Sequence, residues 1–440
     1  MKRSLLLLLS LLLLPMACDP AGNDGPGKTD TPAPTEDTVT PQDAATDVPE
    51  PPADTTTPED LIPWEVDPDP GCNGDFCAAG PDHAPDPAAW GPFPVGVTTM
   101  TVDVLDHAGE PRSLRVEIWY PTTEEFRDGP FEEINIYEDA PEEHKPFIEI
   151  AKTEVPPIET RAVRDAPVRR GDGPYPIVLF SHGAYGVRYQ SVFFTIPLAS
   201  HGYVVASMDH PGNTLYDILT FGYDMDVVVM SSMDRPTDAI MTLTAVTHRN
   251  DVPEDMFYKS MLPDKVGMSG HSFGGFLSLL MGGLDPRIKA IVPMAPASGW
   301  LAIMGYAAED LKIPTLLMGG LADKTLDPDQ ELLPLWPKLP PPKGFLRFAT
   351  GGHYTFSDIC SLDLLKMAEI LDFGDAEDAL KDGCGEMNIP VEQAHPVINQ
   401  LGIGFFNHYL RESPDSLQYF DQAVAEGWSE GEILYDWIAE

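Results

Sequence analysis

Short runs of apolar residues alternate with longer, helix-like stretches from Tyr175 onward. The short runs are apolar on both faces, as strands are when helices cover both sides of a parallel sheet. We therefore predict strands at residues 177–180, 203–208, 265–268, 290–294, 315–318 and 346–349. Helices are predicted between and after them, at residues 191–200, 237–248, 272–282 and 396–411. This alternation predicts an α/β fold with a doubly wound, mostly parallel sheet that binds ligands at the carboxyl ends of its strands.

A different pattern precedes and follows this region. Residues 98–105 and 113–120 alternate polar with apolar residues, and a polar turn with Gly109 separates them. This alternation predicts an N-terminal antiparallel hairpin with one exposed face. Residues 121–170 are polar and acidic, and we expect an insertion with a short helix at 142–152. Residues 413–440 are expected to be a C-terminal extension, with a helix that packs through Trp428 and Trp437.

The first 90 residues predict export. Residues 1–17 combine a basic start with a Leu-rich run too short to span a membrane, which is typical of a signal peptide. Cys18 follows the small residue Ala17, as in bacterial lipoproteins, so we predict a lipid anchor on Cys18; an ordinary cleaved signal peptide is the alternative. Residues 18–90 are acidic and rich in Pro and Thr, which predicts a disordered linker. We expect a protein of the bacterial cell envelope, anchored facing the periplasm or on the cell surface, or otherwise secreted.

The net charge and the cysteines limit the kinds of ligand that this protein is expected to bind. A net charge of −43 argues against nucleic-acid binding, although much of this charge lies in the linker. If Cys18 carries lipid, four cysteines remain, and nearness in sequence favours the disulfides Cys72–Cys77 and Cys360–Cys384. Sequence alone leaves this connectivity open. No group of Cys and His residues has the spacing of a zinc site, so no metal is expected.

The clearest chemical signal is Gly270-His271-Ser272-Phe273-Gly274, which joins a predicted strand to a predicted helix. This is the G-x-S-x-G pattern of a nucleophile elbow, in which a Ser stands at the tip of a strained turn. Residues two before and two after the Ser must be small because a Cβ would meet the neighbouring backbone. A Gly-rich turn with a solvated Ser is the alternative. We favour Ser272 as a nucleophile because other residues fit the same mechanism.

Two of these residues follow the last two parallel strands. Asp323 follows the predicted strand at 315–318, and His353 follows the one at 346–349. The order Ser, Asp, His along the chain is the one that nucleophile-elbow enzymes use. His353 would take the proton of Ser272, and Asp323 would hold the tautomer of the imidazole. A simple turn residue is the alternative for Asp323, and Asp327 is a nearby competitor for the role of the acid.

The oxyanion hole is expected to use the backbone N–H groups of Phe273 and Ala184. Ala184 lies in the loop Ser181-His182-Gly183-Ala184-Tyr185-Gly186, which follows the first parallel strand. We interpret the histidines of the two loops, His182 and His271, as structural. Tyr185 and Trp300 are candidates for the substrate pocket, together with the apolar run 227–230, which could line an acyl pocket or form a lid. Ordinary helix packing explains these apolar residues equally well.

Several separated motifs resemble one group of enzymes. They are Phe180-Ser181-His182-Gly183, Asp209-His210, Arg235-Pro236 with Asp238, and Gly270-His271-Ser272-Phe273-Gly274-Gly275. Together they resemble α/β-hydrolases of the platelet-activating-factor acetylhydrolase and bacterial dienelactone-hydrolase-like group. The resemblance implies an α/β-hydrolase domain at residues 91–412, and serine ester hydrolysis without a metal or an organic cofactor.

The chain also departs from these relatives. In the animal acetylhydrolases the acid follows an earlier strand, where this chain has Ala295-Pro296-Ala297-Ser298 and no carboxylate. This favours Asp323 and weakens the transfer of the animal substrate. The dienelactone hydrolases proper use a Cys nucleophile where this chain has Ser272. Cutinases resemble the chain more distantly and place an aromatic residue at Ala184, which argues against a polyester platform there.

These observations predict an exported serine carboxylic-ester hydrolase that works through an acyl-enzyme. The expected substrates are short acyl esters, or short-chain and oxidised phospholipids. A serine peptidase or amidase is an alternative, since the same triad cleaves amides. A non-catalytic binding lipoprotein on a hydrolase scaffold is a second alternative, against which the complete set of triad residues argues. The oligomeric state is left open.

Overall fold

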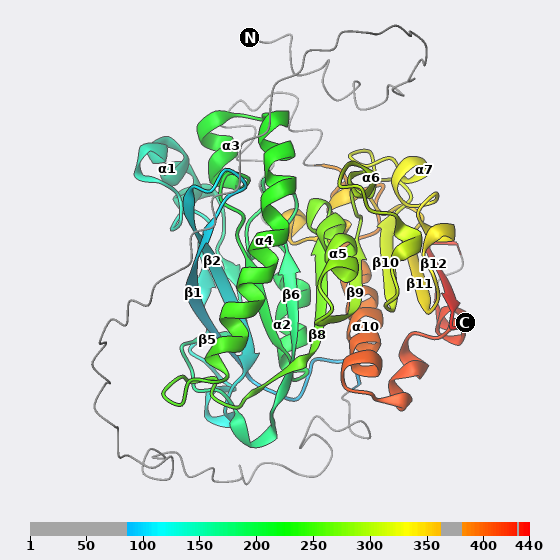
Figure 1. Cartoon of the computed structure of the whole chain (residues 1–440), viewed down its shortest axis with the longest axis horizontal. Helices are drawn as coiled ribbons and strands as arrows, with labels where there is room; N and C mark the ends of the chain where they lie inside the picture. The colour runs from blue at the N-terminus through cyan, green and yellow to red at the C-terminus, as the bar shows by residue number, and fades with distance from the viewer. Residues whose placement is uncertain (1–85, 362–380, 429–430) are drawn as a thin grey trace, which may run out of the picture. The chain divides into compact units, whose positions relative to one another are not determined.

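The computed structural model describes residues 86–361, 381–428 and 431–440. The predicted signal peptide, the linker up to residue 85, Cys18, Cys72 and Cys77 lie outside the described residues. Within the described ranges, ten strands form one sheet in the order β12-β11-β10-β9-β8-β6-β7-β2-β1-β5 (Figure 1). In the same ranges, no helix has the length and the apolar composition needed to cross a membrane.

The centre of the sheet is parallel, as the buried apolar runs predict. Each predicted parallel strand is present, with bounds that differ by a few residues. These strands are β6 (Tyr175–Ser181), β7 (Val204–Met208), β8 (Met261–His271), β9 (Ile288–Met294), β10 (Thr315–Gly320) and β11 (Lys343–Phe348). All neighbouring pairs among them are parallel, so their carboxyl ends meet at one edge of the sheet.

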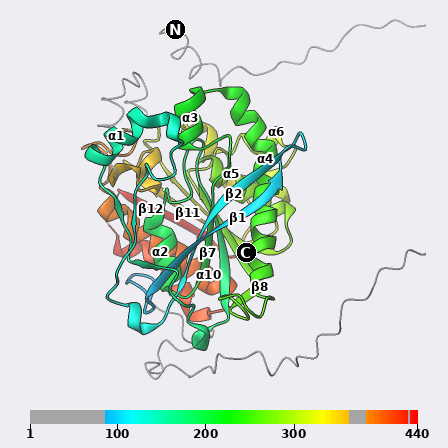
Figure 2. The same ribbon diagram turned by 90° about the vertical axis from the view of Figure 1, so that its left-hand side faces the viewer.

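Antiparallel strands extend the sheet on both sides. The predicted hairpin is formed by β1 (Val95–Leu105) and β2 (Pro111–Pro121), and β2 pairs antiparallel with β7 (blue strands in Figure 2). The short strand β5 (Ala162–Arg164), part of the acidic insertion, pairs with β1 at the edge. At the opposite edge, β12 (Ile433–Ile438) pairs antiparallel with β11. The expected C-terminal helix is therefore wrong for these residues, because Leu434, Tyr435 and Trp437 belong to a strand that covers β11.

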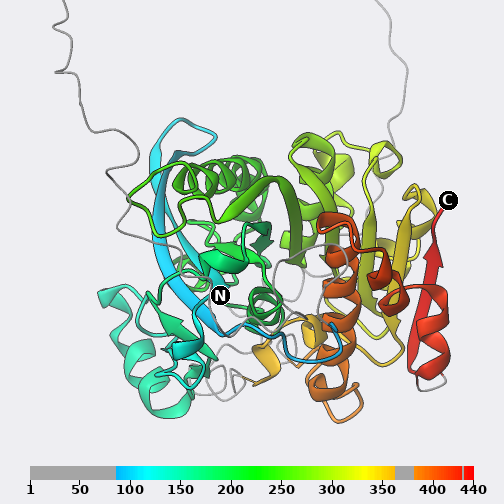
Figure 3. The ribbon, with the colours of Figure 1, turned by 90° about the horizontal axis from the view of Figure 1, so that it is seen from below.

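Helices cover both faces of the sheet (Figure 3). Along β6, Val178 and Phe180 face a core that includes α2 (Val192–Ser200) and α10 (Val391–Leu410). The intervening residues Ile177 and Leu179 face a second core that includes α4 (Met225–Arg249) and α5 (Phe273–Leu284). Successive strand residues point to opposite faces, so an apolar strand of this kind is buried on both sides.

The helix predicted at 237–248 is longer than expected. It is α4, which begins at Met225 because the carboxylate of Asp224 accepts a hydrogen bond from the N–H of Asp226 at 2.9 Å. The apolar run 227–230 therefore lies in a helix, as the alternative of ordinary helix packing expects, and Val228 is buried. The short helix α3 (Leu215–Phe221) precedes α4.

The acidic insertion folds around a small hairpin of β3 (Glu133–Ile134) and β4 (Ile158–Glu159), with the helix α1 (Lys145–Glu154) between them. It lies beside α3 (Figures 1 and 2), where the hydroxyl of Tyr216 donates to the carbonyl of Ile136 at 2.7 Å. Two further short helices, α6 (Trp300–Ile303) and α7 (Pro328–Glu331), follow β9 and β10. They lie at the carboxyl edge of the sheet, where ligand binding is predicted.

Candidate active site

Ser272 stands between β8 and α5 in a strained conformation, with φ 57° and ψ −115°. Its N–H donates to the carbonyl of Met294 at 2.9 Å, which ties the turn to the end of β9. The glycines around it are sterically required. A Cβ on Gly270 would lie 2.4 Å from the carbonyl oxygen of Gly274, and a Cβ on Gly274 would lie 1.9 Å from that of Ser181. The sequence pattern therefore forms the tight elbow it predicts.

Asp323 and His353 are brought together at the ends of β10 and β11. The Nδ1 of His353 lies 2.8 Å from Oδ2 of Asp323, and both side chains are buried. The other carboxylate oxygen, Oδ1, accepts hydrogen bonds from the N–H groups of Thr325 (2.9 Å) and Leu326 (2.7 Å). Asp323 is thus held by its own loop in the orientation that fixes the imidazole.

The environment of His353 favours proton uptake. Burial alone lowers the pKa of its imidazole, but the carboxylates of Asp323 and Asp382 outweigh burial and raise the pKa above its usual value. His353 also lies next to the elbow, since His271 Nε2 and the carbonyl oxygen of His353 are 3.0 Å apart. Within the described residues the hydroxyl of Ser272 makes no hydrogen bond, so its contact with the imidazole is not formed in this structure. Such contacts often tighten only when substrate binds.

Two backbone N–H groups near the nucleophile have no hydrogen-bond acceptor among the described residues. Phe273 is the first residue of α5, so its N–H has no acceptor inside the helix. Ala184 is exposed, and its N–H makes no hydrogen bond with any described residue. The loop of Ala184 approaches Ser272 closely, because a Cβ on Gly183 would lie 3.3 Å from the Cβ of Ser272. The site thus combines a strained hydroxyl, an imidazole–carboxylate pair and free N–H donors.

Comparisons with known proteins show which families this chain resembles. A family model described as platelet-activating factor acetylhydrolase, isoform II, matches residues 79–218, and a model described as PET hydrolase-like matches residues 178–369. The chain has an α/β-hydrolase fold. Its first match among curated proteins, Cutinase est2 of Thermobifida alba, is 23% identical over 187 residues, which cover 42% of this chain and 55% of the cutinase. The chain thus spans about half the length of that relative.

A solved structure supports this fold. The ferulic acid esterase from Streptomyces cinnamoneus superposes with a TM-score of 0.54, covering 78% of this chain and 96% of the esterase. The two sequences are 22% identical, so this likeness concerns the fold. The resemblance inferred from the separated motifs is confirmed at the level of the α/β-hydrolase group.

Sequence reasoning missed Gln190, which links three parts of the hydrolase site. The N–H of Gly183 donates to Gln190 Oε1 at 3.1 Å, and Gln190 Nε2 donates to His271 Nδ1 at 2.6 Å. His271 then donates from Nε2 to the carbonyl of His353. Burial lowers the pKa of His271 well below its usual value, so the ring is neutral, as this pattern of donors requires. A single Gln in a loop carries no sequence signal for such a role.

A second unpredicted residue, Asp382, connects the loops of the acid and the base. Its Oδ2 accepts from the N–H groups of Lys324 (2.9 Å) and Thr325 (2.8 Å), and its carbonyl accepts from the N–H of Tyr354 at 2.8 Å. The structure joins Cys360 and Cys384 in a disulfide, as nearness in sequence predicts. Cys384 lies two residues after Asp382, so the disulfide holds the loop that carries this aspartate. The two cysteines could be recognised in the sequence, but nothing there indicated the role of Asp382.

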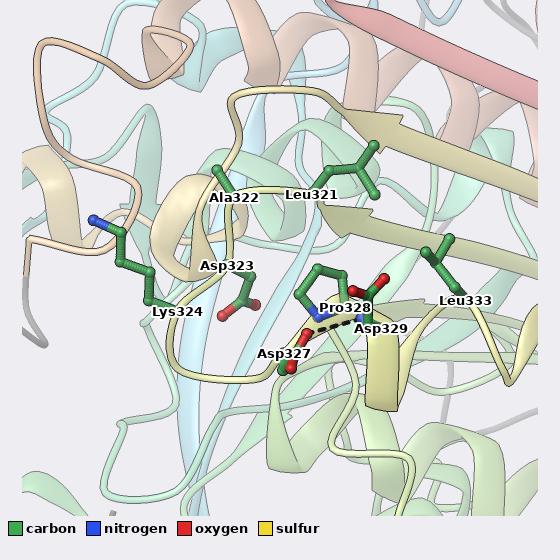
Figure 4. Close-up of a pocket in the computed structure, with 8 residues that line it drawn as sticks. All are labelled: Leu321, Ala322, Asp323, Lys324, Asp327, Pro328, Asp329 and Leu333. Atoms are coloured by element: carbon green, nitrogen blue, oxygen red, sulfur yellow. Dashed lines mark hydrogen bonds between the residues drawn. The ribbon is translucent and has the colours of Figure 1, made fainter.

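The competing acid Asp327 has a different role. Its carboxylate accepts from the N–H of Asp329 at 2.9 Å and caps α7, as the dashed line in Figure 4 shows. Asp327 and Asp323 line a surface pocket of about 500 Å³ with charged neighbours, including Lys324 and Asp329. Its lining is completed by the apolar residues Leu321, Ala322, Pro328 and Leu333.

The predicted pocket residues lie beside the two free N–H groups. The hydroxyl of Tyr185 donates to the carbonyl of Asp224 at 3.0 Å and so connects the loop of Ala184 to the start of α4. Trp300 packs edge-on against Phe273, with ring centroids 5.2 Å apart. Among the described residues no cluster of His, Cys, Asp and Glu side chains could hold a metal ion.

Proposed function

We propose that this α/β-hydrolase is a serine carboxylic-ester hydrolase that works through an acyl-enzyme. The observation that carries the proposal is the buried pair of His353 and Asp323 beside the strained Ser272. Ser272 Oγ attacks the ester carbonyl carbon while His353 accepts the hydroxyl proton. The alcohol then leaves with that proton, and the acyl group stays on Ser272. Water attacks the acyl-enzyme, His353 takes and returns its proton, and the acid is released.

The N–H groups of Ala184 and Phe273 would bind the oxygen that becomes negative in each tetrahedral intermediate. The N-terminus of α5 favours negative charge at the same place, because the helix dipole is positive there. Donors of this kind each contribute about 2.7–4 kcal/mol to transition-state stabilisation. Asp323 keeps His353 in the tautomer whose Nε2 can accept the proton of Ser272.

Short acyl esters, or short-chain and oxidised phospholipids, are the proposed substrates. The proposal is supported by the match of residues 79–218 to the acetylhydrolase family model, a stretch that includes the loop of Ala184. The match of residues 178–369 to the PET hydrolase-like model and the likeness to a cutinase support carboxylic esters as the broader class.

Hydrolysis of p-nitrophenyl esters of increasing acyl length tests the proposal on the purified full chain beside Ser272→Ala. We expect a short-chain optimum and a loss of activity in the variant of about 10⁶-fold, as is typical when a triad nucleophile is removed. Unchanged activity in Ser272→Ala would refute the assignment of the nucleophile. A wild-type protein that cleaves anilides faster than esters would instead indicate an amidase.

We also propose that the chain is exported and lipid-anchored through Cys18, which the sequence pattern of residues 1–18 supports. Wild-type protein should then partition into the membrane fraction of bacteria that express it, whereas Cys18→Ser should be released in soluble form. Identical partitioning of the two proteins would refute the anchor and favour an ordinary signal peptide.

A further inference from the structure

A fully buried arginine on α4, Arg235, lies directly behind the loop of Ala184. Nη1 donates to the carbonyl of His182 (2.6 Å) and to Ser181 Oγ (3.2 Å). Nη2 donates to the carbonyl of Gly183 (3.1 Å) and to Asn213 Oδ1 (2.8 Å). Nε donates to Ser231 Oγ at 3.1 Å. All five N–H groups of the guanidinium are therefore used, which fixes its position completely.

These contacts set the orientation of one peptide group. The carbonyl of Gly183 accepts from Arg235, from His182 Nδ1 at 2.6 Å and from the N–H of Gly186 at 3.2 Å. The N–H of a trans peptide points opposite to its C=O. The N–H of Ala184 therefore points away from Arg235, on the exposed side of the loop. Donors that bind a peptide carbonyl also polarise the peptide, which makes its N–H a stronger donor.

A buried relay holds the guanidinium from its other side. Ser181 Oγ lies 2.9 Å from His210 Nε2, and His210 Nδ1 lies 2.7 Å from Asp238 Oδ2. This is the arrangement of a catalytic triad, but Ser181, His210 and Asp238 are at most 1% exposed, so no substrate reaches them. Since the hydroxyl of Ser181 donates to His210, its oxygen is free to accept from Arg235. The relay thus supports Arg235 and is not a second active site.

We propose that Arg235 is a positioning residue for the oxyanion hole, which it serves by orienting and polarising the peptide between Gly183 and Ala184. The inference rests on the serine-esterase function proposed above. Arg235 also lies 4.8 Å over the ring of Phe273, the residue that supplies the second N–H donor. One cation therefore supports both donors from behind, and Ser181, His210 and Asp238 hold that cation in place.

The test compares Arg235→Met and Arg235→Lys with a matched control, Arg411→Met. Arg411 is also buried, donates to two consecutive carbonyls, His201 and Gly202, and lies 4.6 Å over the ring of Tyr203. These contacts precede β7, at the amino end of the strands, away from Ser272. Arg235→Met and Arg411→Met lose the same kind of interactions, but of the two arginines only Arg235 contacts the loop of Ala184.

For Arg235→Met we expect kcat to fall by about 10- to 100-fold with KM nearly unchanged, below the 10²–10³-fold cost of deleting a donor outright. The affinity for a trifluoromethyl ketone, which forms a tetrahedral oxyanion on Ser272, should weaken in parallel with kcat/KM. Arg235→Lys should show an intermediate loss, because one ammonium cannot bind both carbonyls. Arg411→Met should lower Tm without changing kcat or the ketone affinity.

A folded Arg235→Met with wild-type kcat and ketone affinity would overturn the inference, as would equal losses of kcat in Arg411→Met. If Arg235→Met does not fold, Arg235→Lys and Ser181→Ala decide the question by the same two measurements, and unchanged values in both overturn it. A wild-type protein without esterase activity would refute the proposed function instead. The two failures are thereby distinguished.

Discussion

The closest backbone approach in the site suggests a sharp test, Gly274→Ala. Gly274 is the second residue of the helix that follows Ser272, and its missing side chain leaves room for the end of β6. A Cβ there would lie 1.9 Å from the carbonyl oxygen of Ser181 and 2.8 Å from that of His182. Both neighbours are backbone atoms, which no side-chain rotation can move aside.

The size of the effect follows from these distances. Real Cβ atoms essentially never come within 3.0 Å of another heavy atom, so Ser181 and the helix must separate by roughly 1 Å. Such overpacking typically costs about 1–3 kcal/mol of unfolding free energy. The displaced loop carries the N–H of Ala184, and a misplacement of about 1 Å in a catalytic group typically costs about 10²-fold in rate. We therefore expect kcat to fall about 100-fold.

Gly282→Ala is the matched control in the same helix. Its Cβ would meet only the ends of flexible side chains, with Ile313 Cδ1 nearest at 2.9 Å. Alanine also favours the helix by about 0.5–1 kcal/mol over glycine, so Tm should change little. Both variants are compared by thermal unfolding and by kcat on a short p-nitrophenyl ester. A folded Gly274→Ala with wild-type kcat would refute the claim that this close approach aligns the site.

Three further predictions concern the acid and base loops. Asp323→Asn should lower kcat by about 10⁴-fold. The N–H groups of Thr325 and Leu326 would still donate to the amide oxygen, so the NH₂ group would face His353 and impose the wrong tautomer on its ring. A wild-type kcat would contradict this. Asp382→Asn removes a carboxylate that raises the pKa of His353. The acid limb of the profile of kcat/KM against pH should therefore move to lower pH, and an unmoved limb would exclude this electrostatic role. Cys384→Ser removes the disulfide to Cys360, 24 residues away, and should lower the unfolding free energy by about 3.5 kcal/mol. Thermal or denaturant unfolding measures this loss, and an unchanged transition would show that the disulfide does not stabilise the fold.

Much of the site could be predicted because its residues follow strands with clear patterns. Ser272 and Asp323 come directly after buried apolar runs, and parallel strands bring such positions to one edge. Gly270 and Gly274 could be predicted because the G-x-S-x-G spacing lies within one segment, although the backbone that requires them to be glycine includes Ser181 on another strand. Gln190 and Asp382 escaped prediction because their partners are distant in sequence. A hydrogen bond across the fold leaves no pattern in either segment.

The errors in the fold have similar physical causes. Residues 225–236 mix apolar with polar residues, and Pro236 falls inside the helix, so the start of α4 at Met225 was hidden. The strand β12 alternates weakly because both of its faces carry apolar or aromatic residues and Asp436 is its one charged residue. A short apolar run at a chain end is ambiguous between a helix and a strand until its partner is known. For β12 the partner is β11, which lies about ninety residues earlier in the chain.

This last strand has a consequence for the order in which the protein matures. The carboxylate of Glu432 accepts from the N–H (3.0 Å) and hydroxyl (2.8 Å) of Thr350, three residues before His353, and β12 begins at the next residue. These residues are synthesised after all the other strands and helices of the described fold, because they follow them in the chain. A nascent chain that lacks them exposes the edge of β11, where other strands can pair, and leaves the loop of the base without its support. Hydrolytic competence should therefore arise only after residues 432–438 have been made, and deleting residues 432–440 should abolish it.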